Sequence, residues 1–412
     1  MMLDSEKSAG TASPGAVAAA KVIKTPQTVL LEDAYAHCKL LSRDKHHDLL
    51  QECLRDEIWN GEVHHLKSVA SVATRVLHEK IRYVENARGK RGQWYVWNGF
   101  FWKKNQQLLA QGVVAEFMHD YAILTSARTR RLETLLSLRA TEETLRLMRK
   151  DGRICTTPRD WDIKQNFVAY TDGSVYVVED GEVSDSPRKA SPSDMITTVF
   201  KEAPTTTADC PRWLDFMEFA FPNEETRRWV QACLGSSLVP GNENHLIVVF
   251  IGKTNNGKSA MLGAIREALG RDLVFPLSPW DLSYMDPMLA RAIEKARLVV
   301  IPVGDRISTA TIKRANCNVL MACNAPPKFT RSDKDVERRL ICVPMRKVIT
   351  DEMRDRYFKK HLKEKELGGI SAWLLEGLRA WLSRDSLMDT LSADIDEETR
   401  RVHRHLNPSP SG

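Results

Sequence analysis

The chain has 412 residues, 42% of them apolar and 28% charged, and a formal net charge of +6. This composition excludes a wholly disordered chain, and the length leaves room for about two or three domains with sizeable cores. The small positive charge permits a nucleic-acid partner without requiring one, because acidic residues nearly balance the basic ones.

The sequence carries no pattern of a membrane or secreted protein. Its longest strongly apolar run, residues 246–252, is far too short to span a bilayer, so we expect no membrane partner. The eight cysteines form no CxxC pair and no regular framework, which is typical of reduced thiols in an intracellular protein and leaves the compartment open. Residues 1–27 lack the apolar core of a signal peptide and are predicted to form a disordered tail.

Residues 28–150 are predicted to form a mostly helical N-terminal domain, because apolar residues recur at helical spacing over 28–87 and again over 106–150. Between these stretches, two short aromatic runs flank Asn98-Gly99, which is a strong hairpin signal. The tryptophans of this hairpin have two interpretations, stacking on the bases of a single strand or packing on neighbouring elements, and we favour packing. They are Trp94, Trp97 and Trp102.

Residues 151–225 are predicted to form a small α/β domain that precedes a further domain at 226–350. Short strands and turns dominate its first part, and two amphipathic helices follow within 210–241. Asp160 and Asp162 superficially offer the carboxylate pair of a primase or nuclease metal site. No third acid stands near them in a clear strand context, so we predict no metal site there. The N-terminal stretch is short and helical and offers no convincing catalytic acids, so we do not predict primase activity.

Residues 250–262, FIGKTNNGKSAML, fit the phosphate-loop pattern GxxxxGK[ST]. A buried-strand pattern precedes the loop and an amphipathic helix pattern closed by Gly270 follows it, which argues against an ordinary glycine turn. In such a loop the backbone amides surround a phosphate, the lysine reaches the β and γ oxygens, and the hydroxyl ligates Mg²⁺. The predicted cofactors are therefore ATP and Mg²⁺, and the predicted contacts are Gly252, Thr254, Asn255, Asn256, Gly257, Lys258 and Ser259. Lys258 is expected to be an exposed loop lysine.

Two further motifs lie downstream of the loop. An apolar strand pattern over 317–329 ends in Asn324, which can hold the attacking water or sense the γ-phosphate, or can simply cap the turn after the strand. Arg338 and Arg339 then precede another strand pattern. Adjacent arginines are usually a solvated pair, but in an oligomeric ATPase one of them can reach the γ-phosphate of the neighbouring subunit as an arginine finger.

The order of these motifs resembles a superfamily-three helicase of the poxvirus and phage primase-helicase type. The motor motifs are the loop with Asn-Gly-Lys-Ser, a strand, Gly-Asp, a strand ending in Asn-x-Pro, and Arg-Arg-Leu. Upstream, WYVWNGFFW and VAYTDGSVYVVEDGEV resemble the domain that precedes the motor in those proteins. Downstream, ELGGISAWLLEGLRAW resembles their closing helix, so that the resemblance covers about residues 80–385.

The resemblance implies an α/β fold with an AAA+ P-loop domain around a parallel sheet, which we place at residues 226–350. It further implies a ring, usually a hexamer, that hydrolyses ATP and moves on single-stranded DNA in the replication of a virus or mobile element, with a primase or polymerase as a further partner. Past residue 350 a helical pattern with a Gly-Gly break predicts a helical region over 351–390, followed by a tail over 391–412.

Basic residues between the second acidic motif and the sensor asparagine face the central channel in that family. Lys313 and Arg314 fall at this place and are the candidate DNA contacts, and a surface basic pair is an equal alternative.

The sequence departs from the family pattern at the second acidic motif. The family's strand ends in acids, whereas here residues 300–303, VIPV, run directly into Gly304-Asp305. Proline and valine can neither ligate Mg²⁺ nor activate water, so Asp305 is the nearest candidate for both roles. If it does not return toward Ser259, the alternatives are Asp281, Asp286 and Glu294.

Three functions therefore compete. The first is an ATP-dependent DNA helicase or translocase, with Lys258, Asn324, Asp305 and the two adjacent arginines as catalytic residues. The second is an ATP- and DNA-binding assembly protein with impaired hydrolysis. The third, a small-molecule P-loop kinase, explains the loop but not Asn324 and the arginine pair.

Overall fold

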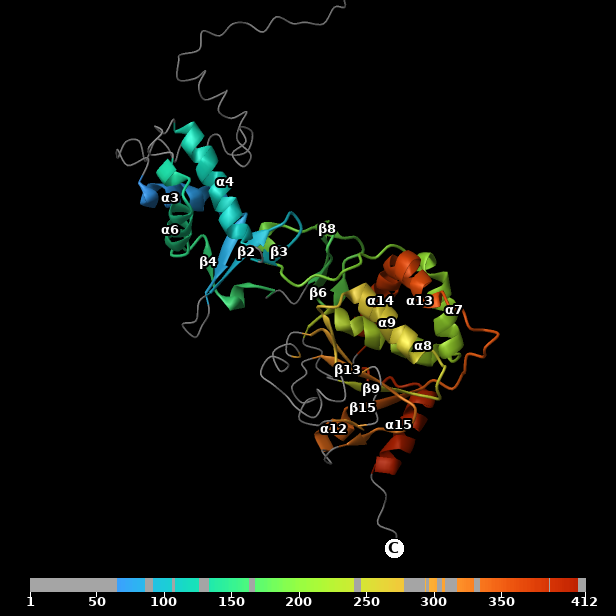
Figure 1. Cartoon of the computed structure of the whole chain (residues 1–412). Coiled ribbons are helices and arrows are strands. Elements are labelled where there is room, and N and C mark those ends of the chain that lie inside the picture. The colour runs from blue at the N-terminus through green and yellow to red at the C-terminus, as the bar shows by residue number, and fades with distance from the viewer. Residues whose placement is uncertain are drawn as a thin grey trace, which may run out of the picture. The chain divides into compact units, whose positions relative to one another are not determined.

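The computed structural model divides into two compact units, Met1–Leu77 with Leu108–Arg153, and His78–Gln107 with Ile154–Gly412 (Figure 1). Each unit is described by itself. The residues that the structure describes are 65–85, 92–105, 108–125, 133–162, 167–240, 246–277, 293, 296–301, 306–307, 317–329, 334–384 and 386–406.

The described part of the first unit is helical, as the apolar spacing predicts. Its helices α3 (Leu66–Leu77), α4 (Leu109–Leu124) and α6 (Leu138–Met148) pack against one another. Helix α6 begins where the Ser137 hydroxyl accepts a hydrogen bond from the N–H of Ala140 at 3.2 Å, which is an N-cap. The prediction of helix as far as residue 87 is wrong at its end, because Ile81–Val84 pairs with the aromatic run as a strand.

A four-stranded sheet holds the aromatic hairpin, which belongs to the second unit and not to the N-terminal helices. The turn is at the predicted place: Gly99 has a φ of +100°, and Asn98 Oδ1 accepts hydrogen bonds from the N–H groups two and three residues ahead. Trp102 is 1% exposed and donates its Nε1–H to a backbone carbonyl at 2.8 Å, while Trp94 and Trp97 are half-buried. Packing therefore accounts for Trp102. The strands are β1 (Ile81–Val84), β2 (Gln93–Trp97), β3 (Trp102–Lys104) and β4 (Cys155–Thr156).

A second small sheet is antiparallel and precedes two helices. The predicted helices are present as α7 (Pro211–Ala220) and α8 (Glu224–Gly235), and Asn223 caps α8 by accepting from the N–H groups of Glu225 and Thr226. The strands of the sheet are β5 (Phe167–Ala169), β6 (Ser174–Glu179), β7 (Glu182–Val183) and β8 (Arg188–Lys189).

Helix α8 packs closely on α14 (Leu367–Leu382), and two glycines make this approach possible. A Cβ on Gly235 would lie 2.2 Å from the backbone N of Leu378, and one on Gly377 would lie 2.2 Å from Gln231 O. The two backbones therefore touch where any side chain would keep the helices apart.

The largest sheet is parallel and has five strands in the order β10-β11-β13-β9-β15. Its three central strands are buried along their whole length, as expected for a parallel sheet covered on both faces. The strands are β9 (Ile247–Ile251), β10 (Val274–Pro276), β11 (Leu298–Ile301), β13 (Asn318–Cys323) and β15 (Leu340–Pro344). The chain is thus a mixed α/β protein.

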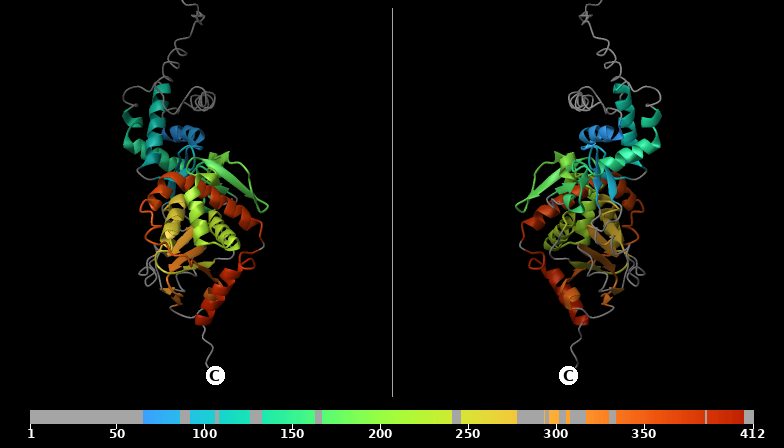
Figure 2. Two further views of the ribbon diagram at one scale, coloured as in Figure 1. Left: turned by 90° about the vertical axis from the view of Figure 1, so that its right-hand side faces the viewer. Right: turned by 90° about the vertical axis from the view of Figure 1, so that its left-hand side faces the viewer.

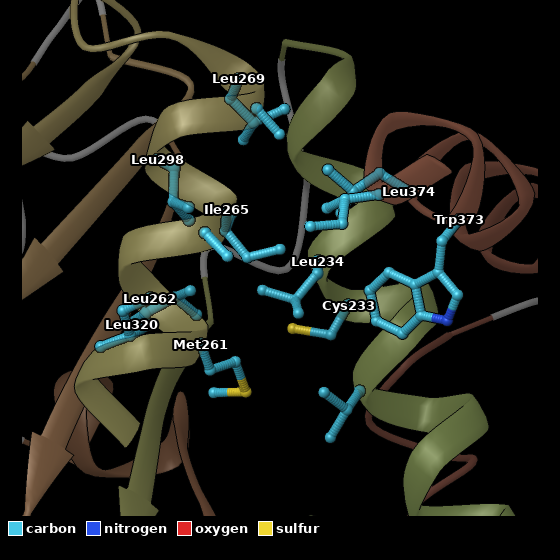
Figure 3. Close-up of a cluster of buried hydrophobic side chains, with 14 of the residues drawn as sticks. Cys233, Leu234, Met261, Leu262, Ile265, Leu269, Leu298, Leu320, Trp373 and Leu374 are labelled. Carbon is cyan, nitrogen blue, oxygen red and sulfur yellow. The ribbon is translucent and has the colours of Figure 1, made fainter. Parts of the chain in front are cut away.

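Helices cover both faces of this sheet. Helix α9 (Lys258–Leu269) lies between the sheet and α8, and Figure 3 shows Leu262 and Ile265 of α9 in the cluster that includes Leu320 of the sheet and Leu234 of α8. The opposite face is covered by α15 (Ala393–Leu406) (Figures 1 and 2). Val402 of this helix is fully buried against the strands.

The C-terminal part differs from the sequence prediction in two places. The predicted tail contains α15, because the buried Ile395 and Val402 give this polar helix an apolar face that packs on the sheet. The Gly-Gly pair does not break a helix but lies in the first turn of α14, where a Cβ on Gly369 would lie 2.7 Å from Cys210 Cβ.

The remaining elements are short. A two-stranded parallel sheet joins β12 (Arg306–Ile307) to β14 (Lys328–Phe329). Within the described part of the chain, no helix has the length and apolar character needed to cross a membrane. The other helical segments used below are α12 (Lys334–Arg338), α13 (Phe358–His361) and a π-helical turn, Leu362–Glu366.

Candidate nucleotide site

The phosphate-loop sequence forms the connection from β9 to α9 at the carboxyl edge of the parallel sheet. Gly257, immediately before α9, has a φ of +89°, and a Cβ there would lie 2.4 Å from Phe216 Cε2. A Cβ on Gly252 would lie 2.1 Å from Met345 O. Close contacts leave no room for a Cβ at either glycine. Gly257 is also required because its backbone is left-handed.

The loop is attached to the strands on both sides of β9. Gly252 N–H donates to Cys323 O at the end of β13, at 3.2 Å. Asn255 O accepts from Ile349 N–H at 2.7 Å, beyond β15. These bonds hold the loop between the end of β13 and the segment that follows β15.

Lys258 is not the exposed lysine that the sequence suggests, because only 7% of the residue is accessible. Its Nζ donates to Gly252 O at 2.6 Å, to Lys253 O at 3.0 Å and to Asn256 Oδ1 at 2.9 Å. Burial lowers the pKa of this ammonium below its ordinary value. An ammonium has three N–H donors, so a phosphate oxygen can bind it only by replacing at least one of these acceptors.

The loop opens into a pocket of about 1150 Å³. Most of the predicted contacts border this space: Thr254, Asn255, Asn256, Gly257, Lys258 and Ser259. Ser259 is exposed in the first turn of α9 and lines the pocket, so a residue with an oxygen ligand for Mg²⁺ follows the lysine directly. Asn324 also lines the pocket and directly follows β13, as its place in the sequence predicts.

The opposite wall of the pocket was not predicted from the sequence. It consists of α7 and of residues 349–359, which follow β15. The guanidinium of Arg212 on α7 binds the Asp355 carboxylate at 2.8 Å and so joins these two segments. Arg356 and Lys359 add positive charge at this wall, and the basic run RDRYFKK at 354–360 is the sequence signal that points to them.

Aromatic packing fixes the position of α7 against the loop. The Phe216 ring lies 5.5 Å from the Phe358 ring and 6.0 Å from the Trp213 ring, and it meets Gly257 directly. The buried carboxylate of Glu366 accepts from the N–H groups of Trp213 and Arg212 at 2.9 and 3.3 Å, which caps the start of α7.

Arg338 and Arg339 lie at the opposite edge of the sheet from the loop of the same chain. Arg339 O accepts from Ile247 N–H at the start of β9, whereas the loop begins after Ile251. Four residue steps along a strand separate the two edges by roughly 13 Å. Arg338 is exposed and Arg339 is half-buried.

Several predicted residues lie outside the described part of the chain. Strand β11 is described as far as Ile301. In the sheet, β13 lies between β11 and β9, so the end of β11 is roughly 10 Å from β9, the strand before the loop. The residues outside the description are Asp305, Lys313 and Arg314, together with the alternatives Asp281, Asp286 and Glu294.

The two acids at 160 and 162 have local structural roles. Asp160 accepts from the N–H and hydroxyl of Thr157, and Asp162 accepts from the N–H groups of Thr197 and Thr198. No group of three or more potential metal-binding side chains occurs among the residues that the structure describes.

A family model described as D5 N terminal like matches residues 71–222. This D5 N-terminal-like stretch includes the aromatic hairpin and the small antiparallel sheet, which are two of the regions that resemble the domain ahead of the motor in primase-helicases. It ends before the phosphate loop. No curated protein matches the chain.

Solved structures of the NrS-1 C-terminal region share a weak likeness with the chain. One apo structure is 9% identical with a TM-score of 0.35, over 56% of this chain and 70% of that one. Another is 11% identical with a TM-score of 0.38, over 50% of this chain and 53% of that one. These values are too low to support an inference about function.

Proposed function

We propose that the chain is an ATP-dependent DNA helicase or translocase of a replication system, with an AAA+ P-loop domain built on the parallel sheet. The observation that carries the proposal is the pocket in which Lys258, Ser259 and Asn324 meet at the carboxyl edge of the sheet. Parallel α/β sheets bind ligands at this edge. The D5 N-terminal-like match upstream of the loop is consistent with the proposal.

The roles of the site residues follow from their chemistry. Backbone amides of the loop and the start of α9 bind the phosphates, and Lys258 neutralises charge on the β and γ oxygens. The Ser259 hydroxyl would hold Mg²⁺, which supplies charge neutralisation on the phosphate oxygens when bound. Asn324 orients the attacking water from the neighbouring strand.

The position of the arginine pair supports action between subunits. Arg338 and Arg339 are on the wrong edge of the sheet to serve the loop of their own chain. In a ring, one of them would reach the γ-phosphate bound by the next subunit. We therefore propose a homo-oligomeric ring, with a hexamer as the expected state, and Lys313 and Arg314 as contacts to single-stranded DNA.

A second candidate is an ATP- and DNA-binding assembly protein that hydrolyses slowly. It is favoured by β11, whose residues Leu298–Ile301 are apolar and buried and offer no carboxylate to Mg²⁺ or water. Asp305 is the nearest acid that could compensate.

Phosphate release from ATP, measured with and without single-stranded DNA, distinguishes these functions. Hydrolysis that DNA stimulates and Lys258→Ala abolishes supports the motor. Tight ATP binding with little release supports the assembly protein, and failure of the wild-type chain to bind ATP refutes both. Light scattering with nucleotide present tests the ring, which a strictly monomeric protein would exclude.

A further inference from the structure

Asn256 is the most buried of the loop's polar side chains, with 2% of the residue exposed. Its Oδ1 accepts from Lys258 Nζ at 2.9 Å and lies 3.4 Å from the backbone N of Lys258. Its Nδ2 donates to Met345 O at 3.1 Å, immediately after β15. The amide oxygen therefore faces a donor and the amide nitrogen faces an acceptor, and reversing the amide would break both contacts.

The loop backbone closes around this side chain. A Cβ on Gly252 would lie 2.4 Å from Asn256 Nδ2, so the first glycine of the motif leaves room for the amide. The other two acceptors of the Lys258 ammonium are backbone carbonyls of the loop itself. Among the three, Asn256 alone accepts through its side chain, and the other end of that side chain reaches Met345 O beside β15.

We infer that Asn256 is a positioning residue of the proposed nucleotide site, because its amide holds the Lys258 ammonium and ties it to the end of β15. The inference rests on the proposed function in one respect, which is that the Lys258 ammonium binds phosphate. Strand β15 begins directly after Arg338 and Arg339 and ends one residue before Met345, whose carbonyl Asn256 binds. Strand β15 thus connects the arginine pair to the contact of Asn256, the residue that binds the Lys258 ammonium.

Two variants separate this role from simple space filling. Asn256→Asp keeps the size of the side chain and an acceptor for Lys258, but it replaces the donor to Met345 and adds negative charge. Asn256→Ala removes both contacts. Asn223→Asp is the matched control, because Asn223 caps α8 and aspartate is an equally good N-cap.

The first measurement needs no nucleotide. Lys258 in the full chain is modified by an amine-reactive reagent over a range of pH, and mass spectrometry follows the reaction. The pH dependence yields the Lys258 pKa and the limiting rate at which its neutral amine is modified. Exposed Lys347 serves as the internal reference. We expect Asn256→Asp to raise the Lys258 pKa by about one unit, since an adjacent carboxylate favours the ammonium, and Asn256→Ala to increase the limiting rate several-fold.

The second measurement is ATP·Mg affinity by titration. Asn256→Ala should weaken binding roughly tenfold through loss of one charge-assisted contact, and Asn256→Asp should weaken it further because its carboxylate also repels phosphate. Thermal melting checks that each variant folds. If Asn256→Ala does not fold, the isosteric Asn256→Asp variant by itself tests the positioning role.

An unchanged Lys258 pKa and limiting rate in the folded variants would overturn the inference and leave Asn256 as a filler of the loop. A shifted pKa in Asn256→Asp, with no shift in Asn223→Asp, supports it. Wild-type protein that shows no ATP binding would refute the proposed function, while the Lys258 pKa would still decide the positioning role.

Discussion

Replacing Gly257 with alanine is expected to destabilise the second unit and to remove tight ATP binding. The φ of +89° costs a residue with a Cβ about 1–2 kcal/mol. The new Cβ would lie 2.4 and 2.7 Å from Cε2 and Cζ of Phe216, so the ring must move. Phe216 is 7% exposed and packs on Trp213 and Phe358, so its movement adds about 1–3 kcal/mol of overpacking strain. The two terms sum to about 2–5 kcal/mol.

The assay is the free energy of unfolding of wild type, Gly257→Ala, Phe216→Leu and the double variant, with ATP titration on each folded protein. In the Phe216→Leu background the new Cβ no longer meets the phenyl ring, so Gly257→Ala should lower the unfolding free energy by only about 1–2 kcal/mol. Gly263→Ala is the control in the same helix: a Cβ there meets nothing within 4 Å, and alanine should stabilise α9 by about 0.5–1 kcal/mol.

Two results would refute this reasoning. Wild-type stability in Gly257→Ala would show that the loop does not have this backbone conformation. An equal cost of the alanine in both backgrounds would show that Phe216 does not press on the loop.

Further predictions concern binding, hydrolysis and the pocket wall. Lys258→Ala should weaken ATP·Mg binding by roughly one to two orders of magnitude in a titration, because a charge-assisted contact to phosphate is lost; unchanged affinity would contradict the assignment of the loop. Subunits with Arg338→Ala or Arg339→Ala, mixed with Lys258→Ala subunits, should regain some phosphate release if an arginine acts across the interface, and no regain in either mixture would argue against it. Asp305→Asn should lower single-turnover hydrolysis further from an already slow rate, and robust turnover in this variant would assign the role to another acid. Glu366→Ala should lower the unfolding free energy by about 2 kcal/mol, since it leaves two N–H groups at the start of α7 without their acceptor. The exposed Glu364→Ala is its control, with an expected change within about 0.5 kcal/mol.

The sequence by itself determined the parts of this protein that depend on local backbone preferences. Asn98-Gly99 marks the hairpin turn, and Gly270 marks the end of α9, because both glycines adopt positive φ values that other residues avoid. The spacing of the phosphate loop, between an apolar run and an amphipathic run, likewise identified β9 and α9 and the residues that face the pocket.

Contacts between segments far apart in the chain decided the rest. The exposure of Lys258 was mispredicted, because its burial depends on how the loop folds back on itself and against β15. The Gly-Gly pair looks like a helix break in sequence, but it lies within α14 because Cys210 packs against it. The segment that forms α15 was predicted to be a tail, because its sequence is polar and has few apolar residues. Packing of those few residues on the sheet stabilises the helix, and this packing cannot be read from the sequence.

The second wall of the pocket is the clearest case of tertiary control. Arg212 and Asp355 are separated by more than a hundred residues and form an ion pair at 2.8 Å, which no local pattern encodes. Spacing along a chain specifies which residues share a turn or a face, whereas the partners that meet across a pocket depend on the packing of whole elements. The connection between β9 and α9 could therefore be predicted from thirteen letters of sequence, while the pocket that it borders required the fold.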